Sequence, residues 1–146
     1  ALKVYGTPVE LDSEESFSLW SEFRSLSVMP FSTDTALWRI STLPTKAADI
    51  VFAIQKFMPA VAFYDWGGSM VWLEVPAAAD AGAADVRRAV AVRGGHATLI
   101  RAEPEVRGNV DVFEPLKPEI ERLTRGIKSA FDPSGLFNRG RMYANL

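Results

Sequence analysis

Two strand-like runs separated by a pair of glycines constrain the fold of this chain more than any other feature. The runs are AVAFYDW at 60–66 and SMVWLEV at 69–75, with Gly67 and Gly68 between them. Both are rich in the β-branched and aromatic residues typical of strands. Glycines suit a tight hairpin turn because such turns require positive φ angles. The pattern therefore predicts an antiparallel hairpin that turns at Gly67-Gly68.

This turn also predicts which side chains share a face. It sets Trp66 opposite Ser69 and Asp65 opposite Met70, and directly opposed residues lie on the same side of a sheet. One face then carries Ala62, Tyr64, Trp66, Val71, Leu73 and Val75, and the other carries Val61, Phe63, Asp65, Met70, Trp72 and Glu74. The second face holds the charges, so we expect no helix to cover it. A shift of one residue in the register would reverse the assignment.

The segments around the hairpin predict a complete small sheet. A strand at 36–43 precedes a helix whose N-cap is Thr45, and a helix ending at Gly94 precedes a strand at 96–102. In the first helix Ile50, Val51, Ile54, Phe57 and Met58 recur at helical spacing, and in the second Ala83, Val86, Ala89 and Val90 face inward. The order strand, helix, strand, strand, helix, strand predicts an α+β chain with the ferredoxin-like β-α-β-β-α-β fold and both helices on one face.

Extensions flank this core. Residues 1–35 form an N-terminal extension with a predicted helix at 14–26, residues 36–102 form the core, and residues 103–146 form a C-terminal helix and return segment. We expect one domain overall. In the C-terminal helix Pro118 occupies the first turn, and an apolar stripe runs along one side. Its members are Ile120, Leu123, Ile127 and Phe131.

Composition excludes several classes of function. The net charge is −2 and the pI about 5.4, so nothing indicates nucleic acid as the partner. With no cysteine and one histidine, we expect no disulfide and no metal site. No apolar run reaches membrane-spanning length, which makes the cytoplasm the default location. The chain begins with Ala1 rather than Met, as a processed or cut product would.

Few residues on the predicted surfaces could carry chemistry. Arg39 alternates with Trp38 and Ile40 and so points to the uncovered face, where a guanidinium can bind a carboxylate through two hydrogen bonds or can simply be solvated. His96 can carry a proton near neutral pH, although histidines at a helix–strand junction more often make structural hydrogen bonds. Phe63, Met70 and Trp72 give the uncovered face an apolar area that usually meets a ligand or a partner.

The segment FDPSGLFNRGRMY at 131–143 is unusually specified for a terminus. Asp132-Pro133-Ser134-Gly135 fits a type I turn, after which we expect Leu136 and Phe137 to pack onto the domain. A second turn, Asn138-Arg139-Gly140-Arg141, is rich in hydrogen-bond donors. Such a segment suits a polar ligand, or else it locks the last helix in place.

Four motifs in this chain resemble those of a known family. FDPSGLFNRGRMY is similar to the C-terminal signature of FAD-linked oxidases of the vanillyl-alcohol oxidase type. LWRIS at 37–41, DWGGSMVWL at 65–73 and GGHATLIR at 94–101 resemble the E subunits of bacterial glycolate oxidases within that family. The motifs occur in the same order and span residues 37–143. Arg139 departs from the family, which usually has proline there.

The resemblance implies a function that the residues alone do not. Family members place a cap domain over the flavin of a separate FAD-binding domain, and this chain matches only the cap and the return segment. Phe63, Met70 and Trp72 would face the flavin and a small 2-hydroxy acid such as glycolate. Arg39 would hold the substrate carboxylate, His96 would assist proton removal, and Asn138, Gly140 and Arg141 would lie near FAD. The partners would be the FAD-binding domain or sister oxidase subunits, in the cytoplasm or peripheral to the inner membrane. This chain alone would be inactive.

Two other hypotheses remain open at this level. A stand-alone ferredoxin-like module could use the uncovered face for a small ligand or for a homodimer. A purely structural subunit of an oxidase complex would leave the redox chemistry to sister chains.

Overall fold

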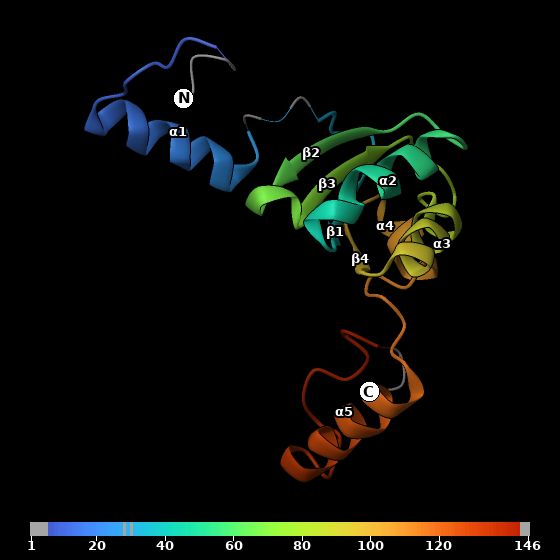
Figure 1. The fold of residues 1–146 in the computed structure, drawn as a ribbon. Helices are drawn as coiled ribbons and strands as arrows, with labels where there is room; N and C mark the ends of the chain where they lie inside the picture. Colours follow the sequence, from blue (N-terminus) through green and yellow to red (C-terminus); the bar gives the residue numbers. More distant parts are fainter. Residues whose placement is uncertain (1–5, 28, 30, 144–146) are drawn as a thin grey trace. The chain divides into compact units, whose positions relative to one another are not determined.

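The computed structural model describes residues 6–27, 29 and 31–143, and its ribbon is drawn in Figure 1. The chain divides into two compact units, Ala1–Phe31 and Ser32–Leu146. The predicted core and the C-terminal segment both belong to the second unit.

The first unit contains one well-capped helix, α1 (Ser13–Ser25). The Asp12 carboxylate accepts hydrogen bonds from the backbone N–H groups of Glu14 and Glu15, and the Glu15 carboxylate accepts one from the N–H of Asp12. This reciprocal arrangement is a capping box, which satisfies N–H groups that a helix start leaves unpaired. The helix buries none of its residues. Local capping therefore defines α1, because packing contributes little.

The second unit alternates strands and helices around a small sheet. Its elements are β1 (Ala36–Ser41), α2 (Pro44–Gln55), β2 (Val61–Asp65), the 3₁₀ turn η2 (Trp66–Gly68), β3 (Met70–Val75), α3 (Ala83–Arg93), β4 (His96–Arg101), α4 (Pro104–Asn109) and α5 (Pro118–Phe131). The sheet order is β2-β3-β1-β4, and every pair of neighbouring strands is antiparallel. Figure 1 shows α2 and α3 on the same side of this sheet. The mixed helix and strand composition and the antiparallel sheet that the sequence predicts are confirmed.

The core lies between the sheet and these two helices. Along β3, Val71, Leu73 and Val75 are buried while the residues between them are half-buried, as expected of a strand covered on one face. From the helical side, α2 contributes Ile50 and Ile54 to the same cluster. The expected inward residues of α3, namely Ala83, Val86, Ala89 and Val90, are all buried.

Trp38 anchors the centre of this core. It is fully buried, and its indole Nε1 donates a 2.8 Å hydrogen bond to the Ala81 carbonyl. Ala81 adopts a positive φ of 52°, which is unusual for a residue with a Cβ. The indole therefore connects β1 to the loop before α3.

The start and end of α2 differ from the sequence prediction. The predicted N-cap was Thr45, but the helix begins at Pro44 with Leu43 as N-cap and no side-chain cap hydrogen bond. Proline suits the first helical position because its missing N–H has no partner there in any case. The helix ends at Gln55, which leaves Phe57 outside it and 65% exposed, although Met58 still packs against the core.

The hairpin has the predicted register but a longer turn. Asp65 pairs with Met70 as predicted, and β2 then ends. The expected strand pair of Trp66 and Ser69 is wrong, because Trp66 opens the 3₁₀ turn with a φ of 50°. The Asp65 carboxylate accepts a hydrogen bond from the Trp66 N–H at 2.7 Å, and this bond favours the 3₁₀ turn over a further strand pair.

The C-terminal segment also departs from expectation. The prediction that Leu136 and Phe137 pack onto the domain is wrong, since they are 76% and 66% exposed. The short helix α4 was not foreseen, because six residues are too few for a periodic apolar pattern. Helix α5 begins at Pro118 as expected, yet none of its residues is buried.

Candidate functional site

The register of the sheet aligns four side chains in one row on the face opposite α2 and α3. Arg39 of β1 pairs with Trp72 of β3 on one side and with Thr98 of β4 on the other. Trp72 in turn pairs with Phe63 of β2. Directly opposed residues share a face, so the row runs Thr98, Arg39, Trp72, Phe63 across all four strands. We call this face of the sheet the open face.

A second row lies beside the first. His96 pairs with Ser41, Ser41 with Met70, and Met70 with Asp65. His96 is therefore the diagonal neighbour of Arg39, at a Cα separation of about 7–8 Å in a regular antiparallel sheet. All five sheet residues singled out from the sequence thus lie on one face. They are Arg39, His96, Phe63, Met70 and Trp72.

The open face is only partly accessible to solvent. Arg39 and His96 are exposed, whereas Phe63, Met70 and Trp72 are half-buried. Two further residues of this face are buried, Leu37 at 4% and Thr98 at 7% exposure. The polar groups at its surface therefore stand beside apolar surroundings, which strengthen any hydrogen bond made there.

One polar atom on this face has no partner. The indole Nε1 of Trp72 has less than 1 Å² of accessible surface and no acceptor among the described residues. A buried donor left unpaired costs about 1–3 kcal/mol, so proteins rarely keep one without a reason. By contrast, the indole of Trp38 on the other face has its acceptor in Ala81.

The two carboxylates of the open face are both engaged with backbone groups. Glu74 accepts a hydrogen bond from the Ser32 N–H at 2.6 Å, and Asp65 accepts one from the Trp66 N–H. Among the described residues the ion pairs are Arg88–Asp85, Arg125–Glu121 and Lys128–Asp132, so none includes Arg39. Its guanidinium therefore faces solvent with no carboxylate of the described chain neutralising it.

Asp132 organises the C-terminal segment. Its carboxylate accepts hydrogen bonds from Lys128 Nζ and from the backbone N–H groups of Phe137 and Leu136, at 2.5, 2.9 and 2.9 Å. These donors, with Lys128 the strongest, lower the pKa of Asp132 from 3.8 to about 2. The predicted type I turn is present, since the Gly135 N–H donates to the Asp132 carbonyl at 3.0 Å. The sequence predicted the turn but missed the role of this carboxylate.

Two of the three residues expected near a cofactor line a cavity at this end of α5. Asn138 and Arg141 border a space of about 400 Å³, and Gly140 lies between them in the second turn with a φ of 68°. The lining is Thr124, Lys128, Phe131, Asp132, Phe137, Asn138, Arg141, Met142 and Tyr143. No residue of the open face is among them. The sheet residues and the tail residues therefore form two separate candidate sites in this chain.

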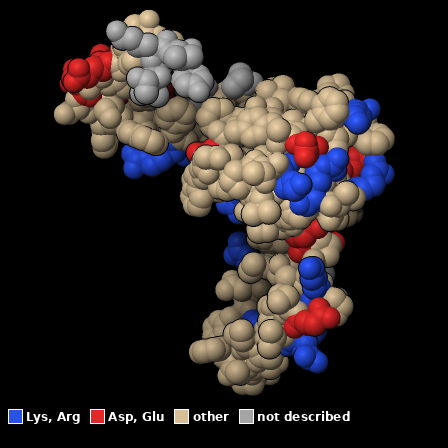
Figure 2. Space-filling view, viewed as in Figure 1, with Lys and Arg blue, Asp and Glu red and all other residues tan. Residues whose placement is uncertain are grey.

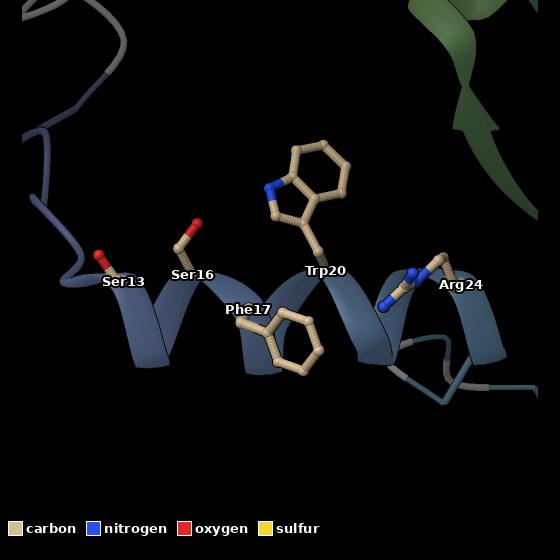
Figure 3. A pocket seen from close by; sticks show the side chains of 5 residues that line it. All are labelled: Ser13, Ser16, Phe17, Trp20 and Arg24. Carbon is tan, nitrogen blue, oxygen red and sulfur yellow. The ribbon is translucent and has the colours of Figure 1, made fainter.

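A shallow pocket along α1 was not expected from the sequence. This open space of about 540 Å³ is lined by Ser13, Ser16, Phe17, Trp20 and Arg24 (Figure 3). The Arg24 guanidinium lies 5.9 Å from the centre of the Phe17 ring, within reach of a cation–π contact. Phe17 and Trp20 are 70% and 64% exposed, so this helix presents aromatic surface within its own unit.

Two other kinds of site are absent from the described part of the chain. No group of three or more histidine, cysteine, aspartate or glutamate residues there could hold a metal ion. None of the described helices is both long and apolar enough to cross a bilayer. Figure 2 shows acidic and basic side chains interspersed on the visible face of the second unit, without a broad area of either sign.

The sheet and its open face define a small α+β module with a donor-bearing, half-buried surface. Among curated proteins, the chain is 33% identical over 133 residues to "Glycolate oxidase subunit GlcE" of Escherichia coli (strain K12). The match covers 91% of this chain but only 33% of that subunit, so the chain corresponds to about one third of its relative's length. No family model matches the chain, and no solved structure matches it significantly.

Proposed function

We propose that this chain is the cap portion of an FAD-dependent glycolate oxidase subunit, and that it roofs the flavin and helps to bind the carboxylate of a small 2-hydroxy acid. The similarity to the glycolate oxidase subunit over 91% of the chain carries this proposal. Two features of the fold support it. The element order and the sheet order β2-β3-β1-β4 suit a ferredoxin-like cap, and α2 and α3 lie on the same side of the sheet, opposite the open face (Figure 1).

The residues of the open face suit a substrate and a flavin. Arg39 would bind the substrate carboxylate, because its guanidinium is exposed and has no ion pair with a described carboxylate. His96, its diagonal neighbour, would accept the proton of the substrate hydroxyl. Phe63, Met70 and Trp72 would supply the apolar surface against which a planar ring packs.

The cofactor enters this proposal through the part of the relative that the match does not cover. When bound, FAD would accept a hydride from the substrate, and this chain would position the substrate and exclude water. Asn138, Gly140 and Arg141 would approach the cofactor or its domain, since the donors of Asn138 and Arg141 border a cavity with aromatic walls. We infer that the partners are an FAD-binding domain or sister oxidase subunits, in the cytoplasm or at the inner membrane surface.

The proposal is tested on the complex that contains this chain. An affinity tag is added to the chain in the organism that produces it, and the chain is purified together with its partners. The absorbance of bound flavin is then measured before and after glycolate is added, because reduction of the flavin lowers this absorbance. We expect Arg39→Ala to raise KM for glycolate by at least about tenfold, because the substitution removes a charge-assisted hydrogen bond to the substrate. His96→Ala should lower kcat, because it removes the group proposed to accept the hydroxyl proton. Arg88→Ala on α3, whose side chain is 58% exposed, is the matched control.

Two results would overturn the proposal. One is a preparation that contains the chain but no flavin, and the other is a flavin that glycolate does not reduce. The rival function, a stand-alone binding or dimerisation module, is favoured by the exposed apolar side chains of α5. It predicts a stable colourless homodimer of the isolated chain. Flavin bound by the isolated chain alone would contradict the cap proposal, because the proposal assigns most FAD contacts to another domain.

A further inference from the structure

The pairing of Arg39 with Trp72 carries an inference about how the open face recognises its ligand. The two residues are directly opposed in neighbouring strands, which holds their Cα atoms about 4.5–5.5 Å apart. Both carry N–H donors, and neither the Arg39 guanidinium nor Trp72 Nε1 has an acceptor given to it by the described residues. Arg39 and Trp72 are therefore two hydrogen-bond donors on the open face that have no acceptor among the described residues.

A carboxylate is the ligand that matches this pair. It offers two oxygens with several acceptor sites, so one oxygen can accept from the guanidinium while the other accepts from the indole. A cation is excluded because both groups only donate. An apolar ligand would leave Trp72 Nε1 unpaired in a buried position.

The other polar side chains of the open face leave Trp72 Nε1 without an acceptor. Glu74 and Asp65, the carboxylates of the same face, are already bonded to backbone N–H groups of Ser32 and Trp66. They do not satisfy the indole. Thr98, which pairs with Arg39 on the other side, is buried. Because Nε1 has less than 1 Å² of accessible surface, a ligand oxygen can reach it only if a neighbouring side chain changes rotamer. Exposed side chains change rotamer within nanoseconds.

We propose that Arg39 and the indole N–H of Trp72 form a paired donor site for the carboxylate of the ligand, with Trp72 a substrate-binding residue and not only an apolar wall. The identity of the ligand as a 2-hydroxy acid rests on the proposed function. The donor pair itself rests on the strand register and on the unpaired indole.

The test observes the indole directly and needs no flavin. The chain has four tryptophans, so its ¹⁵N–¹H spectrum contains four indole signals, and Trp72→Phe identifies one of them by its loss. Glycolate is titrated to about 100 mM, which fills about nine-tenths of a site with a Kd of about 10 mM. Glycolamide, its neutral counterpart, is the ligand control, and sodium chloride at equal ionic strength is the salt control.

We expect the Trp72 indole proton to move downfield in a saturable manner with glycolate and to stay in place with glycolamide. In Trp72→Phe the affinity, followed by the backbone amides of Arg39 and Thr98, should fall at least about tenfold. Arg39→Gln should abolish the shift. Trp66→Phe alters a 73% exposed residue of the turn and removes its own indole signal. It should leave both the affinity for glycolate and the shift of the Trp72 signal unchanged.

A Trp72 signal that does not move, or that moves equally with glycolamide, overturns the donor pair. So does an unchanged affinity in a folded Trp72→Phe chain, with folding judged by circular dichroism. These outcomes are independent of the proposed function. A complex without flavin would leave the donor pair intact, and a motionless indole would leave the similarity to the oxidase subunit intact.

Discussion

Lys128 and Asp132 are joined one helical turn apart, with Lys128 Nζ 2.5 Å from Asp132 Oδ2 at the C-terminal end of α5. The same lysine donates to the Phe137 carbonyl, so a single ammonium group ties the helix to the segment that follows it. The Asp132 carboxylate receives the Phe137 and Leu136 N–H groups from that segment. The local order of the tail therefore depends on a charged carboxylate at position 132.

The first prediction concerns acid. Because the folded pKa of Asp132 is lowered to about 2 from 3.8, the order that it confers is fully present above pH 3.8. It is lost as the pH falls through about 2, when the carboxylate takes up its proton. The amide signals of Leu136 and Phe137 should titrate with this low midpoint and exchange faster with solvent below it. In Asp132→Asn both amides should exchange rapidly at neutral pH, and an ordinary carboxyl midpoint in the wild type would contradict the assignment.

The second prediction concerns Trp38. Trp38→Phe removes the donor to the Ala81 carbonyl and part of a fully buried ring. We expect it to lower the free energy of unfolding by about 2–4 kcal/mol, from an unpaired acceptor and a cavity together. Urea unfolding measures the loss. The control Trp66→Phe changes an exposed ring in the same unit and should stay within about 0.5 kcal/mol. Equal stabilities for the two variants would refute the anchoring role.

The third prediction compares two glycines. A Cβ at Gly95 would lie 2.4 Å from the Ser41 carbonyl oxygen at a φ of +135°, so Gly95→Ala should destabilise the chain by more than about 1 kcal/mol. Gly126, inside α5, has nothing within 4 Å of its Cβ position. Gly126→Ala should therefore stabilise α5 by about 0.5–1 kcal/mol. Thermal unfolding and helical circular dichroism together measure both effects, and a change of the same sign in both variants would be inconsistent with this geometry.

The fourth prediction concerns the apolar stripe of α5. Leu123 and Ile127 are 61% and 62% exposed, so their replacement by glutamine should leave the free energy of unfolding within about 0.5 kcal/mol per site. Under the proposed function the same double variant should reduce the amount of partner that copurifies with the chain. Ile50→Gln, which alters a fully buried residue of α2, provides the contrast and should unfold the sheet. A large loss of stability in the α5 variant would show that the stripe belongs to this chain's own core.

The residues of the open face could be predicted from the local sequence pattern. The two glycines predicted the pairing of Asp65 with Met70, and this pairing alone placed Phe63 and Trp72 on one face. Arg39 joined them through simple alternation along β1. Period-two side-chain geometry is a property of any strand, so it was available from the sequence before any packing was known.

The same reasoning failed where packing or a single hydrogen bond decides. Thr45 is a better cap by type than Leu43, yet the N-cap lies two residues earlier, at Leu43, because Pro44 fits the first turn of the helix. Leu136 and Phe137 are apolar, but their backbone N–H groups donate to the Asp132 carboxylate, and their side chains are exposed to solvent. Residue type predicts a tendency to be buried and not the surface that buries it.

The sequence by itself determined the order of the strands and helices from β1 to β4, the hairpin register and the alternation that sorts polar from apolar side chains, because each follows from local backbone geometry. Only the tertiary structure decided which donors remain unpaired, since this depends on where residues distant along the chain bring their acceptors. Two tryptophans illustrate the difference. Trp38 finds the Ala81 carbonyl 43 residues away, whereas Trp72 finds no acceptor among the described residues, and nothing in their sequence context distinguishes them.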